Sequence, residues 1–62
     1  MNRVVGILMK RDSVTKEEAE SRLAECRRLC DECLEDGNYD GVEDTIASEL
    51  GLELDYLFDI LG

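Results

Sequence analysis

A chain of 62 residues makes one domain at most, and its core is marginal because a chain of this size removes only about 60% of its unfolded surface from water. Hydrophobic residues make up 44% of the composition and proline is absent, which excludes a disordered chain and favours helices. The apolar run at residues 4–9 is too short for a membrane span or a secretory signal, so we expect a cytoplasmic protein without membrane association.

Charge is divided unevenly along the chain. Residues 1–28 contain all seven bases and five acids, a net charge of +2. Residues 29–62 contain eleven acids and no base, a net charge of −11. The second half is expected to repel phosphate and to attract a basic surface, although a small soluble domain can also be this acidic.

Residues 3–12 are predicted to form the first helix. Their apolar residues recur at i, i+4 and make one stripe: Val4, Val5, Leu8 and Met9. The order Val-Val-x-Ile-Leu would also suit a short strand, so both alternatives are open at this point.

Residues 16–36 are predicted to form the second helix. Thr15 and Glu18 make a capping box, in which the threonine hydroxyl accepts from a free amide of the first turn. Gly37 can supply the left-handed residue that ends the helix. The apolar seam of this helix consists of Ala19, Leu23, Cys26, Cys30 and Cys33.

Two further helices are predicted at residues 40–50 and 54–61, separated by a corner at Gly51. Asp40 is the expected N-cap of the first of them. The expected inward residues are Val42, Ile46, Ala47 and Leu50 in one helix and Leu54, Leu57, Phe58 and Leu61 in the other. Four helices with short turns predict an all-α four-helix bundle in a single domain, residues 1–62.

The segment Thr45–Leu61 has the steric pattern of a helix-turn-helix unit, with Ala47 in the first helix and Gly51 in the turn. The residues that would enter a DNA groove are Glu53, Asp55, Tyr56 and Asp59. Groove readers use Arg, Lys, Asn or Gln for base edges and cations for phosphates, so this set disfavours DNA binding. A plain helical corner is the simplest interpretation.

The acids of the same region suggest a second interpretation, in which they imitate a phosphate backbone and occupy a basic site on another protein. A solvated surface is the simpler alternative. The candidate partner-binding residues are Asp40, Glu43, Asp44, Glu49, Glu53, Asp55 and Asp59.

Cys26, Cys30 and Cys33 have the C-x3-C-x2-C spacing of an iron–sulfur loop, but they lie within a predicted helix as part of its apolar seam. Buried, reduced thiols are the favoured interpretation, since free cysteine is among the most buried residue types. A soft metal on three sulfurs of one helix face is the alternative.

Residues 36–41 match the first half of an EF-hand calcium loop. The twelfth position of that loop requires a bidentate glutamate, and here it is Ala47.

The chain contains no histidine and no nucleophile with a neighbouring base. We therefore expect no metal, no cofactor and no enzymatic activity.

The blocks LMKRDSVTKEEAE and LGLELDYLFDIL, at the two ends of the chain, resemble a group of short acidic helical proteins encoded in bacterial phages and mobile elements. In that group a proline is usual where this chain has Leu54, and the cysteine trio is not part of the pattern. No settled activity accompanies the resemblance. It implies a bacterial cytoplasm and a protein that acts by binding.

The leading hypothesis is a non-enzymatic interaction module that binds a basic host protein through its acidic C-terminal half, as an inhibitor or DNA mimic, and that could form a homodimer. The alternative is a degenerate helix-turn-helix unit that modulates transcription. In that alternative the phosphate contacts come from Lys10, Arg11, Arg22, Arg27 and Arg28.

Overall fold

The computed structural model describes residues 2–61. Within that range it contains four α-helices and one 3-10 turn, and no strand. The elements are α1 (Arg3–Asp12), α2 (Lys16–Glu35), α3 (Tyr39–Leu50), η1 (Leu54–Tyr56) and α4 (Leu57–Leu61). The prediction of a small all-α bundle is confirmed, and the first segment is a helix rather than a strand.

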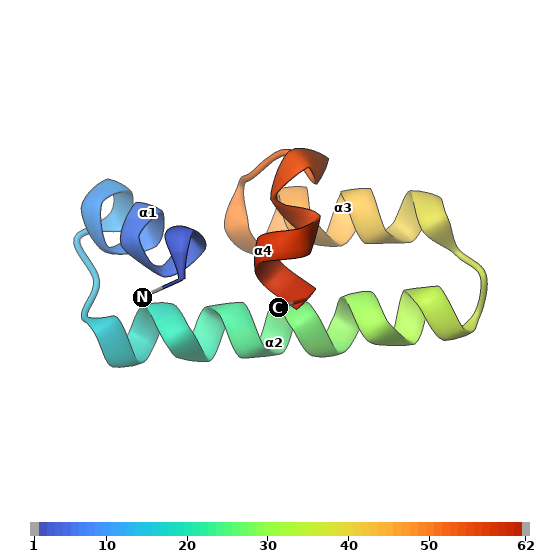
Figure 1. Ribbon diagram of the computed structural model, residues 1–62, viewed down its shortest axis with the longest axis horizontal. Coiled ribbons are helices and arrows are strands. Elements are labelled where there is room, and N and C mark those ends of the chain that lie inside the picture. The colour runs from blue at the N-terminus through green and yellow to red at the C-terminus, as the bar shows by residue number, and fades with distance from the viewer. Residues whose placement is uncertain (1, 62) are drawn as a thin grey trace.

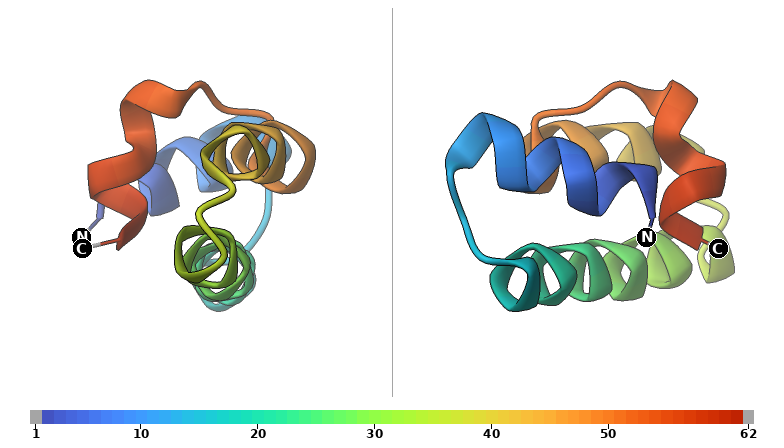
Figure 2. Two further views of the ribbon diagram at one scale, coloured as in Figure 1. Left: turned by 90° about the vertical axis from the view of Figure 1, so that its right-hand side faces the viewer. Right: turned by 60° about the vertical axis from the view of Figure 1, so that its left-hand side comes forward.

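α2 is the base on which the other helices pack (Figure 1). Its 20 residues run along the long axis of a molecule that measures 33 × 16 × 16 Å. α1 lies over its N-terminal half, α3 returns over its C-terminal half, and α4 crosses between them (Figures 1 and 2). All three therefore lie on the same side of α2, and its opposite side faces solvent.

The first two helices begin at side-chain caps. Asn2 accepts a hydrogen bond from the Val4 amide at 2.7 Å, and Thr15 accepts one from the Glu18 amide at 3.2 Å. Ser13 ends α1 in the left-handed conformation, with φ of 54°. The helix start predicted from the Thr15 capping box is confirmed.

The turn between α2 and α3 is a Schellman motif. The amide of Asn38 donates to the Cys33 carbonyl at 2.8 Å, and that of Gly37, with φ of 72°, donates to the Leu34 carbonyl at 3.1 Å. The side chain of Asn38 then accepts from the Gly41 amide at 3.0 Å and caps α3. The prediction of Asp40 as the N-cap is wrong, because Asn38 already caps the helix and Asp40 lies within its first turn.

α3 ends at Gly51, where φ is 66° and the amide donates to the Ala47 carbonyl at 2.9 Å. The corner predicted at this glycine is present. Leu52 follows it and packs, half-buried, against the core. An extended link then leads into η1, which has no side-chain cap.

The core is formed where α1, α3 and α4 meet α2, and it contains no buried polar side chain among residues 2–61. The predicted stripes of α1 and α2 are confirmed in it, with Met9, Leu23 and Cys33 half-buried at their edges. Ala47 is exposed, contrary to expectation, because α3 presents the row at i, i+4, i+8 to α2. The buried residues are Val4, Val5, Leu8, Ala19, Cys26, Cys30, Val42, Ile46, Leu50 and Ile60.

The C-terminal segment buries a different face from the predicted one. It begins with a 3-10 turn instead of a continuous helix, which changes the orientation of the residues that follow. Ile60 is buried and Leu57 and Leu61 are half-buried, whereas Leu54 and Phe58 are exposed. The prediction is therefore wrong for Leu54 and Phe58.

Candidate protein-interaction surface

Three of the seven cations in residues 1–28 pair with acids that are near them in the chain. Arg11 and Arg22 contact Asp12 at 2.9 and 3.2 Å. Arg28 contacts Glu25 and Glu32 at 2.7 and 3.1 Å. Three residues of the set that would contact phosphate in the DNA-binding alternative, Arg11, Arg22 and Arg28, are thus engaged with carboxylates. Lys10, Lys16 and Arg27 make no ion pair among residues 2–61.

The acids of α3 and of the turn after it differ from the paired arginines described above. Six of the seven predicted partner-binding residues are exposed and make no ion pair within the described range. These six form what we call the acidic surface: Asp40, Glu43, Asp44, Glu49, Glu53 and Asp55.

The acids of α3 do not share one stripe. The buried row Val42, Ile46 and Leu50 faces α2, so the helical period directs Asp40 and Asp44 outward. Glu43 and Glu49 lie on opposite flanks of the helix by the same period, and Glu49 is close enough to α2 to contribute to the raised pKa of Cys26. The acidic surface therefore extends around α3. Asp40 and Asp44, at i, i+4, repel each other.

Asp59, the seventh predicted residue, belongs to an internal contact. Its half-buried carboxylate pairs with Arg3, and the Arg3 guanidinium also lies 4.7 Å from the centre of the Tyr56 ring. The side chain of Asn2 donates to the Asp59 carbonyl. These contacts join α4 and η1 to the start of α1. Of the predicted groove-facing set, Glu53 and Asp55 are exposed, and Tyr56 and Asp59 are half-buried.

Arg11 makes a second contact between distant segments. Its guanidinium donates to the carbonyls of Leu50 at 2.6 Å and Gly51 at 3.3 Å, where α3 ends. Its hydrogen bond to Asp12 holds the pKa of that carboxyl below its ordinary value, and the charges of Arg11 and Arg22 act in the same direction. A cation at a helix C-terminus satisfies free carbonyls and is favoured by the helix dipole. The sequence pattern did not indicate this role, because 39 residues separate Arg11 from Leu50.

The cysteines lie in the seam of α2. Cys26 and Cys30 are buried and Cys33 is half-buried, with its sulfur 4.0 Å from the Thr45 hydroxyl. Burial raises the pKa of the Cys26 thiol to about 12, and burial also raises that of Cys30. Within the part of the chain that the structure describes, no three Cys, Asp or Glu side chains converge as a metal site.

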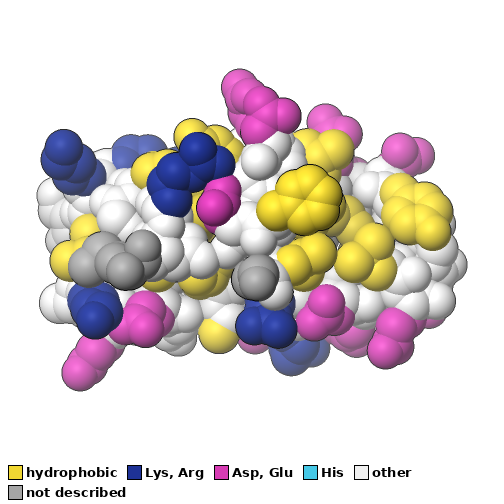
Figure 3. All heavy atoms as spheres, viewed as in Figure 1, with side chains coloured by type: hydrophobic (Ala, Val, Ile, Leu, Met, Phe, Trp, Pro, Cys, Tyr) yellow, Lys and Arg dark blue, Asp and Glu magenta, His cyan; other side chains and the backbone are white. Residues whose placement is uncertain are grey.

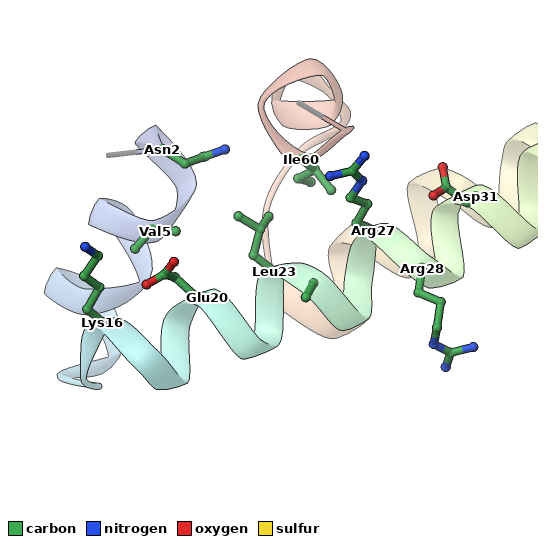
Figure 4. A pocket seen from close by; sticks show the side chains of 10 residues that line it. Asn2, Val5, Lys16, Glu20, Leu23, Arg27, Arg28, Asp31 and Ile60 are labelled. Carbon is green, nitrogen blue, oxygen red and sulfur yellow. The ribbon is translucent and has the colours of Figure 1, made fainter.

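A hollow of about 560 Å³ lies between α1, α2 and α4 (Figure 4). Its apolar lining includes Val5, Leu23 and Ile60. Lys16 and Glu20 lie toward one end and Arg27 toward the other (Figure 4). Since cations and carboxylates alternate along it, the lining favours no one charge of ligand.

Exposed apolar side chains accompany the acidic surface. Phe58 is 84% exposed, Tyr39 70% and Leu54 43%. Figure 3 shows apolar side chains gathered over α4 and continuing toward the end of the molecule where α3 begins, with acidic side chains around them. Burying a phenylalanine contributes about 1.5–3 kcal/mol, so the fold forgoes a large stabilising contribution at Phe58.

Comparison of the chain with protein-family models, with curated proteins and with solved structures finds no match. None of the helices in residues 2–61 has the length and apolar character needed to cross a bilayer.

Proposed function

We propose that this protein is a non-enzymatic interaction module that binds a protein with a basic surface through the acidic surface defined above. The observation that supports this most directly is the exposure of six carboxylates on and after α3 without an ion pair in the described chain. The resemblance noted in the sequence favours a bacterial cytoplasm as the setting. Blocking a host protein, by imitation of DNA, is the corresponding role.

Repulsion within the acidic surface favours the binding of a cationic partner. Neighbouring carboxylates on α3 repel each other in the free protein, and cations of a partner would remove that repulsion. A field of one sign also steers an oppositely charged partner and raises its association rate. The contrast with the first half of the chain, where four arginines are paired internally, leaves most of the unpaired negative charge on the second half.

The test compares two charge reversals of equal size. The double variant Asp40→Lys/Glu43→Lys alters the acidic surface, and Glu17→Lys/Glu20→Lys is its control. Each pair occupies the second and fifth positions of its helix, is exposed and makes no ion pair among residues 2–61. The net charge changes equally in both.

Each variant is used for affinity capture from a nuclease-treated bacterial lysate, with quantification by mass spectrometry. We expect at least a roughly tenfold loss of one basic protein with the α3 variant and retention with the control, because like charges at an interface cost several kcal/mol. Equal recovery with both variants contradicts the proposal. Proteins that are captured only when the nuclease is omitted would instead indicate the DNA-binding alternative.

A further inference from the structure

Leu54 and Phe58 are exposed apolar residues of η1 and α4, and we call this pair the α4 ridge. They are four residues apart in the chain, on either side of the junction between η1 and α4. Phe58 is the only phenylalanine of the chain and the most exposed of its large apolar side chains within residues 2–61. Large apolar groups exposed together commonly mark a contact with another molecule.

The α4 ridge does not pack on the core of this protein. The inward side of the C-terminal segment is formed by Leu57, Ile60 and Leu61, which pack on the core. Arg3 and the Asp59 carboxylate hold the segment in this orientation. Phe58 is therefore directed away from the core by a defined set of contacts.

The charges around the ridge indicate what covers it. Glu53 and Asp55 flank Leu54 in the chain, and both are exposed without an ion pair in the described range. Residues 29–62 contain no Lys or Arg, and Arg3, which contacts this segment, is already paired with Asp59. A twofold dimer through the ridge would place two such surfaces against each other, so a second copy is disfavoured. A partner with both apolar and cationic groups complements the surface.

We propose that the α4 ridge is the anchoring point for a basic amphipathic helix of a partner protein, whose apolar row packs on Leu54 and Phe58 while its Lys or Arg residues meet the acidic surface. This inference rests on the function proposed above and specifies the partner. Apolar residues that recur along one face of such a helix can contact both side chains of the α4 ridge. An aromatic anchor surrounded by polar contacts is the usual arrangement of an interface hot spot.

The experiment uses synthetic peptides of about 15 residues, long enough to form a helix on binding. The probe contains leucine and lysine at helical spacing. A second peptide has the same composition in an order that breaks the apolar row, and a third has glutamate in place of lysine. Binding is measured by fluorescence anisotropy with the full chain, and the contact is mapped by amide chemical shifts.

The variants are Phe58→Ser and, as a matched control, Ala47→Ser, an exposed apolar residue on α3. Both change exposed side chains, and circular dichroism with thermal unfolding verifies that each remains folded. We expect Phe58→Ser to weaken binding of the amphipathic leucine–lysine peptide at least about tenfold, and Ala47→Ser to leave it unchanged. The shuffled peptide is expected to bind at least about tenfold more weakly, and the glutamate peptide is expected not to bind.

Other results separate the two proposals. If Asp40→Lys/Glu43→Lys loses the peptide while Phe58→Ser keeps it, the acidic surface binds without the ridge and this inference is overturned alone. If Phe58→Ser loses the peptide while the charge variant keeps it, or if the glutamate peptide binds equally, both proposals are overturned.

Equal binding of the shuffled peptide overturns the proposal that the partner is a helix. A concentration-dependent dimer in sedimentation that Phe58→Ser abolishes would identify a second copy as the occupant and overturn the inference.

Discussion

At the scale of single residues, two arginines of α1 join segments that are distant in the chain. Arg11 donates to the Leu50 and Gly51 carbonyls at the end of α3, and Arg3 contacts Tyr56 and Asp59 near the end of α4. Both contacts are partly exposed, so solvent screening keeps the contribution of each to stability small. Their main effect is to set where α3 and α4 lie relative to α1.

Removing the Arg11 guanidinium is expected to destabilise the fold modestly. Arg11→Met leaves the Leu50 and Gly51 carbonyls without this donor, and the free energy of unfolding should fall by about 1 kcal/mol. Lys10→Met is the control, because Lys10 is the adjacent base and makes no ion pair among residues 2–61. Urea unfolding of both variants provides the measurement. An equal change in the two would contradict a specific role for Arg11.

The same substitution should alter the titration of Asp12. Hydrogen bonding from Arg11 lowers the pKa of this carboxyl in the folded state, so its contribution to stability is present above the ordinary pKa. That contribution is lost as the pH falls through the lowered value. In Arg11→Met the titration midpoint of the Asp12 carboxyl, followed by carbon NMR, should rise toward the ordinary value. An unchanged midpoint would assign the shift to Arg22 instead.

At the scale of elements, α2 supplies one face to all the other helices, and its central residues are cysteines. Cys26 and Cys30 act there as small apolar side chains and are fully buried in the core. Cys33 lies nearer the edge of the seam and is half-buried. The three thiols are therefore expected to differ in chemical behaviour although they lie on one helix.

Alkylation should reveal that difference. The thiolate is the reactive form, and the raised pKa values of Cys26 and Cys30 keep them protonated at about pH 8. We expect iodoacetamide to modify Cys33 first, as located by peptide mass mapping, and all three at similar rates in urea. Rapid modification of Cys26 in the folded protein would show that the seam of α2 opens readily.

The raised pKa of Cys26 also predicts that the protein loses stability at alkaline pH. The pKa of Cys26 in the folded protein, about 12, lies above the ordinary thiol pKa. The contribution of Cys26 to the free energy of unfolding is therefore fully present below that ordinary pKa. It is lost as the pH rises toward about 12. Cys26→Ala should therefore show a weaker loss of stability with rising pH than the parent chain, as measured by urea unfolding.

At the scale of the whole molecule, the net charge of −9 opposes folding through repulsion among the acids. The long dimension is 33 Å, comparable with the Debye length of about 30 Å at 0.01 M salt. At about 0.1 M salt that length falls to about 10 Å, and repulsion between distant acids is screened. Most of the unpaired acids lie in the second half of the chain, where the acidic surface extends around α3.

Salt should consequently stabilise the protein. We expect the midpoint of urea unfolding to rise when sodium chloride increases from about 0.01 M to about 0.1 M. Asp40→Lys/Glu43→Lys reduces the repulsion on α3 and should show a smaller rise. A midpoint that falls with salt would mean that the ion pairs of α1 and α2 contribute more than the repulsion costs.

The sequence by itself determined the helices and most of their ends. Capping at Thr15 and the glycines at Gly37 and Gly51 act within a few residues, so they are visible in the chain. The buried rows of α1, α2 and most of α3 follow from helical periodicity, and exposure of six predicted acidic residues follows from their cost of burial. These features are local, and local chemistry is sufficient to specify them.

Only the tertiary structure decided which predicted residues are free to contact a partner. Asp59 is engaged because Arg3 reaches it across the fold, and Phe58 is exposed because the 3-10 turn and that contact orient α4 with Ile60 inward. Arg11 is engaged at the end of α3 for the same kind of reason. A short final helix has two apolar sides in its sequence, and packing against distant segments selects the one that is buried.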